Sequence, residues 1–426
     1  PAAPPADEGG DMNRPRETGG DCLTRWFGTT TARRLFIVIA TLVVLRLLLL
    51  YAGDGALSGD FPVFHTAAQA FADGQTMRLF DDAFLDARPD DAATQRWLYP
   101  PHALLLIWPL SLMDMQTAFT VSGVAGWALF AIAGVCTLRV VAPQAPAALY
   151  LALVASPACF WPQSMGHPSL FWFAGLLAAM ALREGGRRVA AGVLIGVLTY
   201  KLTLGVLVAV ALLAARDWRG VIAATGTAIA LSALATLSVG IDYWPALAGK
   251  MLEHLGSPDT ALEAFDTFYR QTGPGGLITS LGGAPPLAAT AQAIVLLICT
   301  IAVAVAWADR EAPAALRIGL LAALIPVAMP AVWFYDAVGL SIGAVLLVAA
   351  GAVPATGLGI AILVLLYGNV LLPFLLGQPA GLATIPAAVG AIWLAATARM
   401  RFATRNASGT VAASRPGALN DPNREE

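Results

Sequence analysis

The sequence predicts an all-α, polytopic integral membrane protein with about 10–12 transmembrane helices. Of its 426 residues, 58% are hydrophobic and only 12% are charged, and the mean hydropathy is +0.71. A soluble domain carries about 25% charged residues. Apolar runs of about 20 residues, the length that crosses the hydrocarbon core, recur between residues 35 and 398. We therefore expect a multi-pass protein of the cell membrane.

Composition predicts three parts along the chain. Residues 1–32 are polar and rich in Pro and Gly at their start, which is typical of a disordered tail. Residues 33–402 hold all of the long apolar runs and predict a single integral membrane domain. Residues 403–426 are polar again and predict a second disordered tail.

Basic residues orient the chain. Three arginines precede the first span, at about 35–52: Arg25, Arg33 and Arg34. By the positive-inside rule the N-terminal tail is cytoplasmic, and the later inner ends carry arginines as well, so both tails are predicted in the cytoplasm. The long loops at about 53–102 and 240–285 then lie outside.

The first outer loop predicts short helices. Residues 66–85 can form amphipathic helices at the membrane interface. Residues 103–112 are apolar but too short to span, and Pro109 interrupts them, so they predict a re-entrant or interfacial piece.

Further apolar runs predict the remaining spans. They lie at about 117–141, 147–161, 168–183, 189–214, 220–239, 286–307, 314–332, 336–351, 355–376 and 381–398. The run 189–214 has basic residues at both flanks, which both favour the cytoplasm. It forms either one long helix or two half-helices that turn back at Thr199, Tyr200 and Lys201. We favour the two half-helices, because they keep the second long loop outside with the first.

Several polar residues fall at or near the outer face in this topology, and ionisable residues within membrane segments usually mark function. They are Asp60, Tyr99, Gln163, His167, Lys201 and Asp336. Lys201 suits an anion such as a phosphate, or else its side chain extends to the interface. Asp336 is either a site residue or a helix N-cap.

The other candidates have alternatives too. Arg46, in the first span, either extends its side chain outward or meets a lipid phosphate. Tyr99 begins a rigid Tyr-Pro-Pro segment. His167 and Gln163 belong to a compact outer turn. Asp60 is one of eight aspartates in its loop, and as a general base it would need a substrate hydroxyl within reach.

Other function classes find no support. The chain has no dense Lys/Arg cluster, so we expect no nucleic-acid partner. The cysteines, Cys22, Cys136, Cys159 and Cys299, show no CxxC spacing, and the four histidines show no paired spacing. We predict neither a metal site nor a cofactor. The glycines of GVLIGV lie on a helix face and indicate packing, not a nucleotide loop.

The order of motifs resembles a known family. The motifs are GDFPVFHTAAQAF with Asp60, LYPPHALLLIWPLSLM with Tyr99, PQSMGHPSLFWFAGL with Gln163 and His167, GVLIGVLTYKLTLGVLV with Lys201, and WFYDAVGL with Asp336. Between about residues 35 and 345 the chain resembles glycosyltransferase family 87, polyprenyl-phosphate-dependent membrane mannosyltransferases with the C-type glycosyltransferase fold.

The resemblance implies transfer of a sugar from a polyprenyl-phosphate donor to a hydroxyl of a lipid or glycan acceptor on the outer face, with inversion and without a metal. It implies that Asp60 is the base, that Lys201 faces the donor phosphate, and that Asp336 is the late aspartate of the family. Two positions depart from the pattern: the family often has Gln where this chain has His167, and often a His before the Tyr-Asp pair, where this chain has Ala331 and Val332.

A transporter or lipid flippase is the alternative, since it would also place polar residues inside a helical bundle. Transporters often contain internal repeats with paired broken helices. The sequence shows one broken pair without a matching one, and two long loops on one side, which favours an enzyme over a transporter. A membrane scaffold protein without activity is a third hypothesis.

Overall fold

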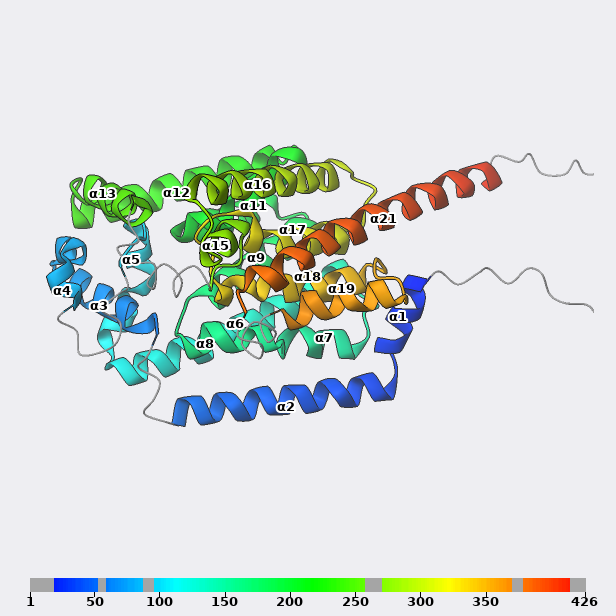
Figure 1. Cartoon of the computed structure of the whole chain (residues 1–426), viewed down its shortest axis with the longest axis horizontal. Coiled ribbons are helices and arrows are strands. Elements are labelled where there is room, and N and C mark those ends of the chain that lie inside the picture. The colour runs from blue at the N-terminus through cyan, green and yellow to red at the C-terminus, as the bar shows by residue number, and fades with distance from the viewer. Residues whose placement is uncertain (1–18, 53–58, 87–95, 257–269, 370–377, 414–426) are drawn as a thin grey trace, which may run out of the picture.

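The chain folds into an elongated bundle made of helices (Figure 1). The computed structural model describes residues 19–52, 59–86, 96–256, 270–369 and 378–413. Within these ranges there is no strand, and the only bridge between extended residues joins Gln271 to Trp333. The predicted all-α class is confirmed.

The described residues are almost all helical. The α-helices are α1 Gly19–Phe27, α2 Thr30–Ala52, α3 Phe61–Ala72, α4 Asp82–Asp86, α5 His102–Ile107, α6 Met115–Val141, α7 Ala147–Val154, α8 Phe160–Ser164, α9 Ser169–Glu184, α10 Arg188–Val197, α11 Leu202–Ala214, α12 Trp218–Val239, α13 Tyr243–Gly256, α15 Pro274–Ser280, α16 Pro285–Ala308, α17 Ala314–Ala328, α18 Val338–Ala349, α19 Gly357–Gly368 and α21 Gly381–Ala413. Short 3-10 helices lie between them: η2 Thr76–Phe80, η4 Trp108–Leu112, η5 Pro157–Cys159, η6 Leu198–Lys201 and η7 Phe334–Ala337.

Six helical stretches of the described residues are long and apolar enough to cross a membrane. They are Thr30–Tyr51, Met115–Val141, Arg188–Ala214, Trp218–Val239, Pro285–Ala308 and Gly381–Thr404. Arg188–Ala214 meets the criteria of length and composition, but it is divided into α10, η6 and α11. The other predicted spans are shorter helices. For example, α18 has 12 residues, about 18 Å, against a hydrocarbon core of about 30 Å. The multi-pass membrane protein predicted from the sequence is confirmed.

The two ends of the bundle differ. Helices α3, α4, α5 and α13 gather at one end, and α1 and the C-terminal end of α21 lie at the other (Figure 1). The two loops predicted outside supply the first end, which we call the outer end. The arginine-rich connections lie at the opposite, inner end.

Helices α10 and α11 form the predicted pair of half-helices. Arg183 Nε donates to Asp217 Oδ2 at 3.0 Å, so both flanks of the run 188–214 meet at the inner end. Gly192 faces Gly220 and Gly196 faces Ala224, so α10 and α12 run parallel. Helix α11 must therefore return to the inner end, and the turn lies at η6, where Lys201 leaves the helical region with φ −125° and ψ 80°.

The chain is helical in parts of both predicted tails. Helix α1 lies within residues 1–32, where Leu23 and Phe27 share one face and are buried. Phe27 stacks on Phe36 with the ring centroids 5.6 Å apart, so this segment packs on the bundle instead of extending as a tail. Helix α21 continues past residue 402 to Ala413. Residues 1–18 and 414–426 lie outside the described residues.

Candidate active site at the outer half of the bundle

Asp60 is held against the turn that follows α8. Its backbone N–H and that of Phe61 both donate to the carbonyl of Met165, each at 3.0 Å. Gly59 has φ +107°, and a Cβ there would lie 2.7 Å from the sulfur of Met165. Gly166 has φ +61°, and a Cβ there would lie 2.4 Å from Cβ of Phe61. Glycine at both positions lets the start of α3 press against this turn.

Two contacts bring η6 to the start of α9. Trp172 Nε1 donates to the carbonyl of Leu198 at 3.0 Å, and Tyr200 Oη donates to the carbonyl of Pro168 at 3.2 Å. Since Lys201 follows Tyr200 directly, these contacts place the lysine beside His167.

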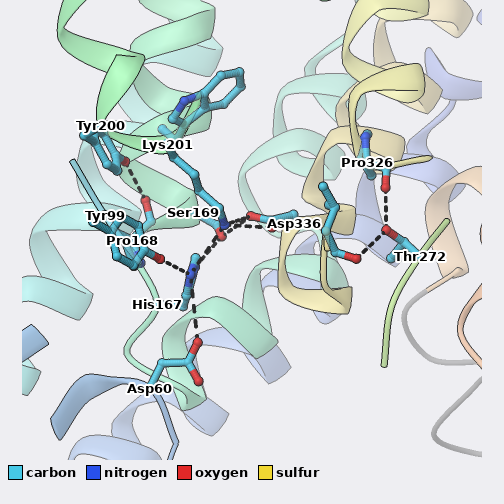
Figure 2. A network of polar contacts seen from close by, with 12 residues as sticks. Asp60, Tyr99, His167, Pro168, Ser169, Tyr200, Lys201, Thr272, Pro326 and Asp336 are labelled. Carbon is cyan, nitrogen blue, oxygen red and sulfur yellow. Dashed lines mark hydrogen bonds and ion pairs between the residues drawn. The ribbon is translucent and has the colours of Figure 1, made fainter. Parts of the chain in front are cut away.

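His167 lies at the centre of the resulting polar network (Figure 2). Its Nδ1 lies 2.6 Å from Ser169 Oγ. Its Nε2 lies 3.2 Å from Tyr99 Oη, 3.4 Å from Lys201 Nζ and 3.9 Å from Asp60 Oδ2. The side chain of His167 is 1% exposed and that of Asp60 is 16% exposed.

Aromatic rings fix the plane of the imidazole. Tyr335 stacks on it at 3.7 Å between centroids and 19° between planes. Phe64 meets it edge-on at 5.7 Å. The ring therefore has little freedom to rotate.

Lys201 and Asp336 form a buried ion pair. Lys201 Nζ donates to both carboxylate oxygens of Asp336, at 2.8 and 2.7 Å, and Ser169 Oγ donates to Asp336 Oδ1 at 2.5 Å. Asp336 is fully buried and the lysine side chain is 10% exposed. The alternative that Lys201 extends to the interface is therefore wrong. The carboxylate of Asp336 makes no capping bond to α18, so the cap alternative is wrong as well.

Burial determines the charge state of His167 and Tyr99, which both lie outside the membrane-spanning segments. It holds the pKa of His167, in the turn between α8 and α9, well below its ordinary value, and the ammonium of Lys201 lowers it further. Burial also raises the pKa of Tyr99 well above its ordinary value, with the negative charge of Asp60 adding to the effect. Both side chains are therefore neutral at physiological pH.

A long apolar groove begins at this network. It has a volume of about 930 Å³ and is lined mainly by α5, α6, α9 and α10. Its outer end is formed by Phe61, Tyr99, Gln163 and His167, and its inner end reaches Gly185 and Arg187. From Leu170 to Gly185 the wall made by α9 is roughly 22 Å long. Groove-lining residues such as Leu129 and Ile132 are 49% and 60% exposed, so the flank of the groove is open.

The groove touches only part of the network. Tyr99, Gln163 and His167 line it, whereas Asp60, Lys201 and Asp336 do not belong to its lining. His167 thus stands between the groove and the ion pair. Gln163 is 2% exposed, and within the described residues neither its amide nitrogen nor its amide oxygen has a hydrogen-bond partner. A buried amide without a partner is costly, so this side chain is available to a ligand.

The structure thus gathers six of the seven predicted site residues, His167 with its neighbours and Gln163 at the outer end of the groove, and leaves one apart. Arg46, on α2, is exposed and its guanidinium lies 5.0 Å above the ring of Phe160. It makes no described contact with the network. Within the described residues no group of three or more His, Cys, Asp or Glu side chains is arranged to hold a metal ion.

Sequence reasoning missed two members of the network, Ser169 and Tyr335. Both lie within quoted motifs, Ser169 in GHPS and Tyr335 in WFYD, but a serine at a helix start and a tyrosine in an aromatic run carry no signal of their own.

Comparison with known proteins shows which family the sequence matches. The model of glycosyltransferase family 87 matches residues 97–332, which is more than half of the chain. The matched range includes Tyr99, His167 and Lys201, and excludes Asp60 and Asp336. No curated protein and no solved structure matches the chain.

Proposed function

The chain belongs to glycosyltransferase family 87, and we propose that it moves a sugar, with mannose as the first candidate, from a polyprenyl-phosphate donor to a hydroxyl of a lipid or glycan acceptor at the outer face of the cytoplasmic membrane. The observation that carries this proposal is the apolar groove that ends at the buried polar network. A single site then combines a place for a long hydrocarbon chain with groups that can act on its polar end.

The groove fits a lipid-linked donor. Its lining is almost entirely aliphatic, aromatic or glycine over the length of α9, and its open flank lets a lipid enter sideways. A prenyl chain would bury its apolar surface there. The polar end of the lipid would then lie near Tyr99, Gln163 and His167.

Asp60 is the proposed base. The acceptor oxygen attacks the anomeric carbon, a new C–O bond forms, and the bond from that carbon to the phosphate oxygen breaks with its electron pair. The polyprenyl phosphate leaves as an anion, and the acceptor proton passes to the carboxylate of Asp60. Attack opposite to the leaving group gives inversion. We propose no cofactor beyond the lipid-linked donor.

Lys201 is the proposed source of positive charge for the donor phosphate. Its ammonium lies 3.4 Å behind His167 Nε2 and is already paired with Asp336. The carboxylate of Asp336 offsets part of this positive charge at the phosphate, and the remainder acts through the protein interior, where the effective dielectric constant is low. Direct contact would require the ring of His167 to move.

A donor screen tests the proposal. The purified protein in lipid nanodiscs is given radiolabelled polyprenyl-phosphate mannose, glucose or arabinose together with extracted lipid acceptors. We expect label in the acceptor fraction with one of these donors, and none when a nucleotide sugar replaces the lipid-linked one. Transfer from the nucleotide sugar would contradict the lipid-donor proposal. Movement of the donor lipid from one leaflet of a liposome bilayer to the other, with no sugar transferred to an acceptor, would favour the transporter or lipid flippase.

A further inference from the structure

Gln163 carries a buried amide that the fold leaves without a hydrogen-bond partner. Its side chain is 2% exposed, and among the described residues neither Nε2 nor Oε1 meets a donor or an acceptor. Most buried polar atoms in proteins are hydrogen-bonded, because an unpaired one is costly. The residue also lines the outer end of the groove. An unpaired amide at this place indicates a ligand that completes its hydrogen bonds.

The turn that holds Gln163 keeps its backbone in a fixed place relative to the rest of the site. The N–H of Gly166 donates to the carbonyl of Gln163 at 3.2 Å. His167 follows Gly166 directly, and the backbone N–H of Asp60 donates to the carbonyl of Met165 at 3.0 Å. One short turn therefore holds Gln163 close to the groups that are proposed to act on the donor.

The amide of Gln163 is free to turn toward a ligand. A glutamine side chain has three rotatable bonds, and its terminal torsion has a broad energy minimum. Because no described residue bonds the amide, it can turn into the groove that Gln163 lines without losing a hydrogen bond to them. A ligand at the outer end of the groove therefore gains these hydrogen bonds without breaking others.

The chemistry of an amide selects hydroxyl groups over a phosphate. Nε2 is a donor only, and Oε1 beside it is an acceptor only. A phosphate anion only accepts, so it would leave the carbonyl oxygen unpaired and repelled. Two neighbouring hydroxyls of a sugar satisfy both atoms, since one donates its proton to Oε1 and the other accepts from Nε2. Each hydroxyl then meets a different atom of the amide.

We propose that Gln163 binds two neighbouring hydroxyl groups of the sugar on the lipid-linked donor, and is thus a residue that determines sugar specificity. This inference rests on the proposed function, because it names the part of the donor that lies at the outer end of the groove. The prenyl chain fills the apolar part of the groove, and the sugar lies against the turn with Gln163. The phosphate between them faces His167, with the charge of Lys201 behind it.

Thermal unfolding of the ligand-free protein separates this role from a structural one. Gln163→Met keeps the length of the side chain and removes the amide. We expect an unfolding temperature equal to that of the unaltered protein or above it, because a buried unpaired group is lost. A clearly lower temperature would show that the amide has a partner within the protein, and would overturn the inference.

Binding without turnover tests recognition of the sugar. The probes are polyprenyl-phosphate mannose, glucose and arabinose, and polyprenyl phosphate without a sugar, and native mass spectrometry of nanodiscs measures their affinities. We expect the unaltered protein to bind one sugar-bearing lipid about tenfold more tightly than polyprenyl phosphate. Gln163→Met should lose most of this difference, with the affinity for polyprenyl phosphate unchanged.

Ser164→Ala is the matched control on the same helix. Ser164 is half-buried, its Oγ donates to the carbonyl of Trp161 at 3.1 Å, and it does not belong to the groove lining. This variant should keep the preference for the sugar-bearing lipid. Equal weakening of all probes in Gln163→Met, no weakening at all, or no preference for a sugar in the unaltered protein would overturn the inference.

Deoxy sugars identify the hydroxyls that Gln163 binds. Donors that lack one hydroxyl at a time are compared in the unaltered protein and in Gln163→Met. We expect loss of either of two neighbouring hydroxyls to raise the donor KM several-fold in the unaltered protein and to add little in Gln163→Met, where their partner is already absent. Full deoxy effects that persist in Gln163→Met would show that the hydroxyls bind elsewhere.

The two proposals fail in different ways. Sugar transfer by Gln163→Met with an unchanged donor KM would reject the inference and keep the proposed function. A protein that binds the sugar-bearing lipid through Gln163 but transfers no sugar from any donor would reject the proposed transfer, while the recognition of the sugar would stand.

Discussion

Asp60 reaches the centre of the site because the start of α3 contacts the turn after α8 closely. Gly59 and Gly166, one on each side of this contact, have no side chain that would block it. The side chain of Asp60 remains 16% exposed, whereas that of His167 is 1% exposed and that of Asp336 is fully buried. A base that must meet an incoming substrate needs such access. The same aspartate also lies within 3.9 Å of the only histidine of the described network.

Asp60→Asn should lower the rate of sugar transfer at least about 100-fold, because an amide cannot take the acceptor proton. The rate is measured with saturating donor and acceptor in nanodiscs. Asp73→Asn, an exposed aspartate that ends α3, is the matched control and should keep full activity. If Asp60→Asn retains full activity, another group is the base.

Lys201→Met should destabilise the fold, because it leaves the fully buried carboxylate of Asp336 without its partner. Removing one member of a buried ion pair costs about 3–5 kcal/mol. Thermal unfolding followed by size-exclusion chromatography measures the loss. Adding Asp336→Asn removes the unpaired charge and should recover much of the stability. Donor KM is then measured in the double variant, where an unchanged value would reject the role of Lys201 toward the donor.

At the residue scale the sequence could identify the ionisable members of the site but not their connections. A charge within or beside an apolar run stands out, and on this ground the sequence indicates Lys201 and Asp336 as site residues. That the two form one ion pair depends on η6 and η7 meeting in space. Ser169 carries no such signal, since serine is common at helix starts. Arg46 did stand out as a charge, but the exposed position of its side chain on α2 keeps it from the site.

At the scale of elements, the hairpin of α10 and α11 is what brings Lys201 to the site. The half-helix α10 packs very closely on α12, since a Cβ on Gly196 would lie 2.5 Å from the carbonyl oxygen of Ala224. Hydropathy alone predicts a single span here, and only the arginines at both flanks indicated a turn. The sequence located most of the other helices within a few residues, because apolar length decides them, but it did not show which would be too short to span. The predicted span 147–161 is instead divided into α7, η5 and the start of α8, and the predicted span 381–398 continues as a helix to Ala413. Residues 370–376 of the predicted span 355–376 lie outside the described residues.

Gly196→Ala should therefore destabilise the protein by about 1–3 kcal/mol, the usual cost of forcing an extra group into a packed interface. Gly205→Ala, in the other half-helix, is the matched control: a Cβ there meets nothing within 4 Å. It should be neutral or stabilising by up to about 1 kcal/mol, since alanine favours a helix. Thermal unfolding of both variants measures the change in stability. Equal changes in the two variants would argue against close packing of α10 on α12.

At the scale of the whole molecule, the buried helices and the outer end of the bundle have different roles. Helix α18, which follows η7 with Asp336 directly, is buried from Val338 to Val348, and α17 packs against it and is buried from Ile318 to Ala328. The outer end covers the site with α3, α5 and α13 (Figure 1). Tyr243 of α13 receives a hydrogen bond from Trp97 and donates one to the carbonyl of Tyr99, which ties the two outer loops together over the groove.

The groove along α9 predicts how the protein responds to the length of the donor lipid. Ala178 lines it about halfway along α9, so Ala178→Phe should fill that part and exclude a long prenyl chain while leaving the polar end intact. We expect KM for a long-chain polyprenyl-phosphate sugar to rise about tenfold or more, as several buried methylene groups are lost at about 0.8 kcal/mol each. A donor with two isoprene units ends before the blocked part and should keep its KM.

Ala230→Phe on α12 is the control for the added ring, since Ala230 is exposed and does not line the groove. It should leave both donors unaffected. A rise in KM for the long and the short donor alike in Ala178→Phe would indicate a distorted site and not a blocked groove. Unchanged use of the long donor would mean that the prenyl chain lies elsewhere. The groove is the structural observation that supports the proposed function. That result would therefore leave family membership as the remaining support for it.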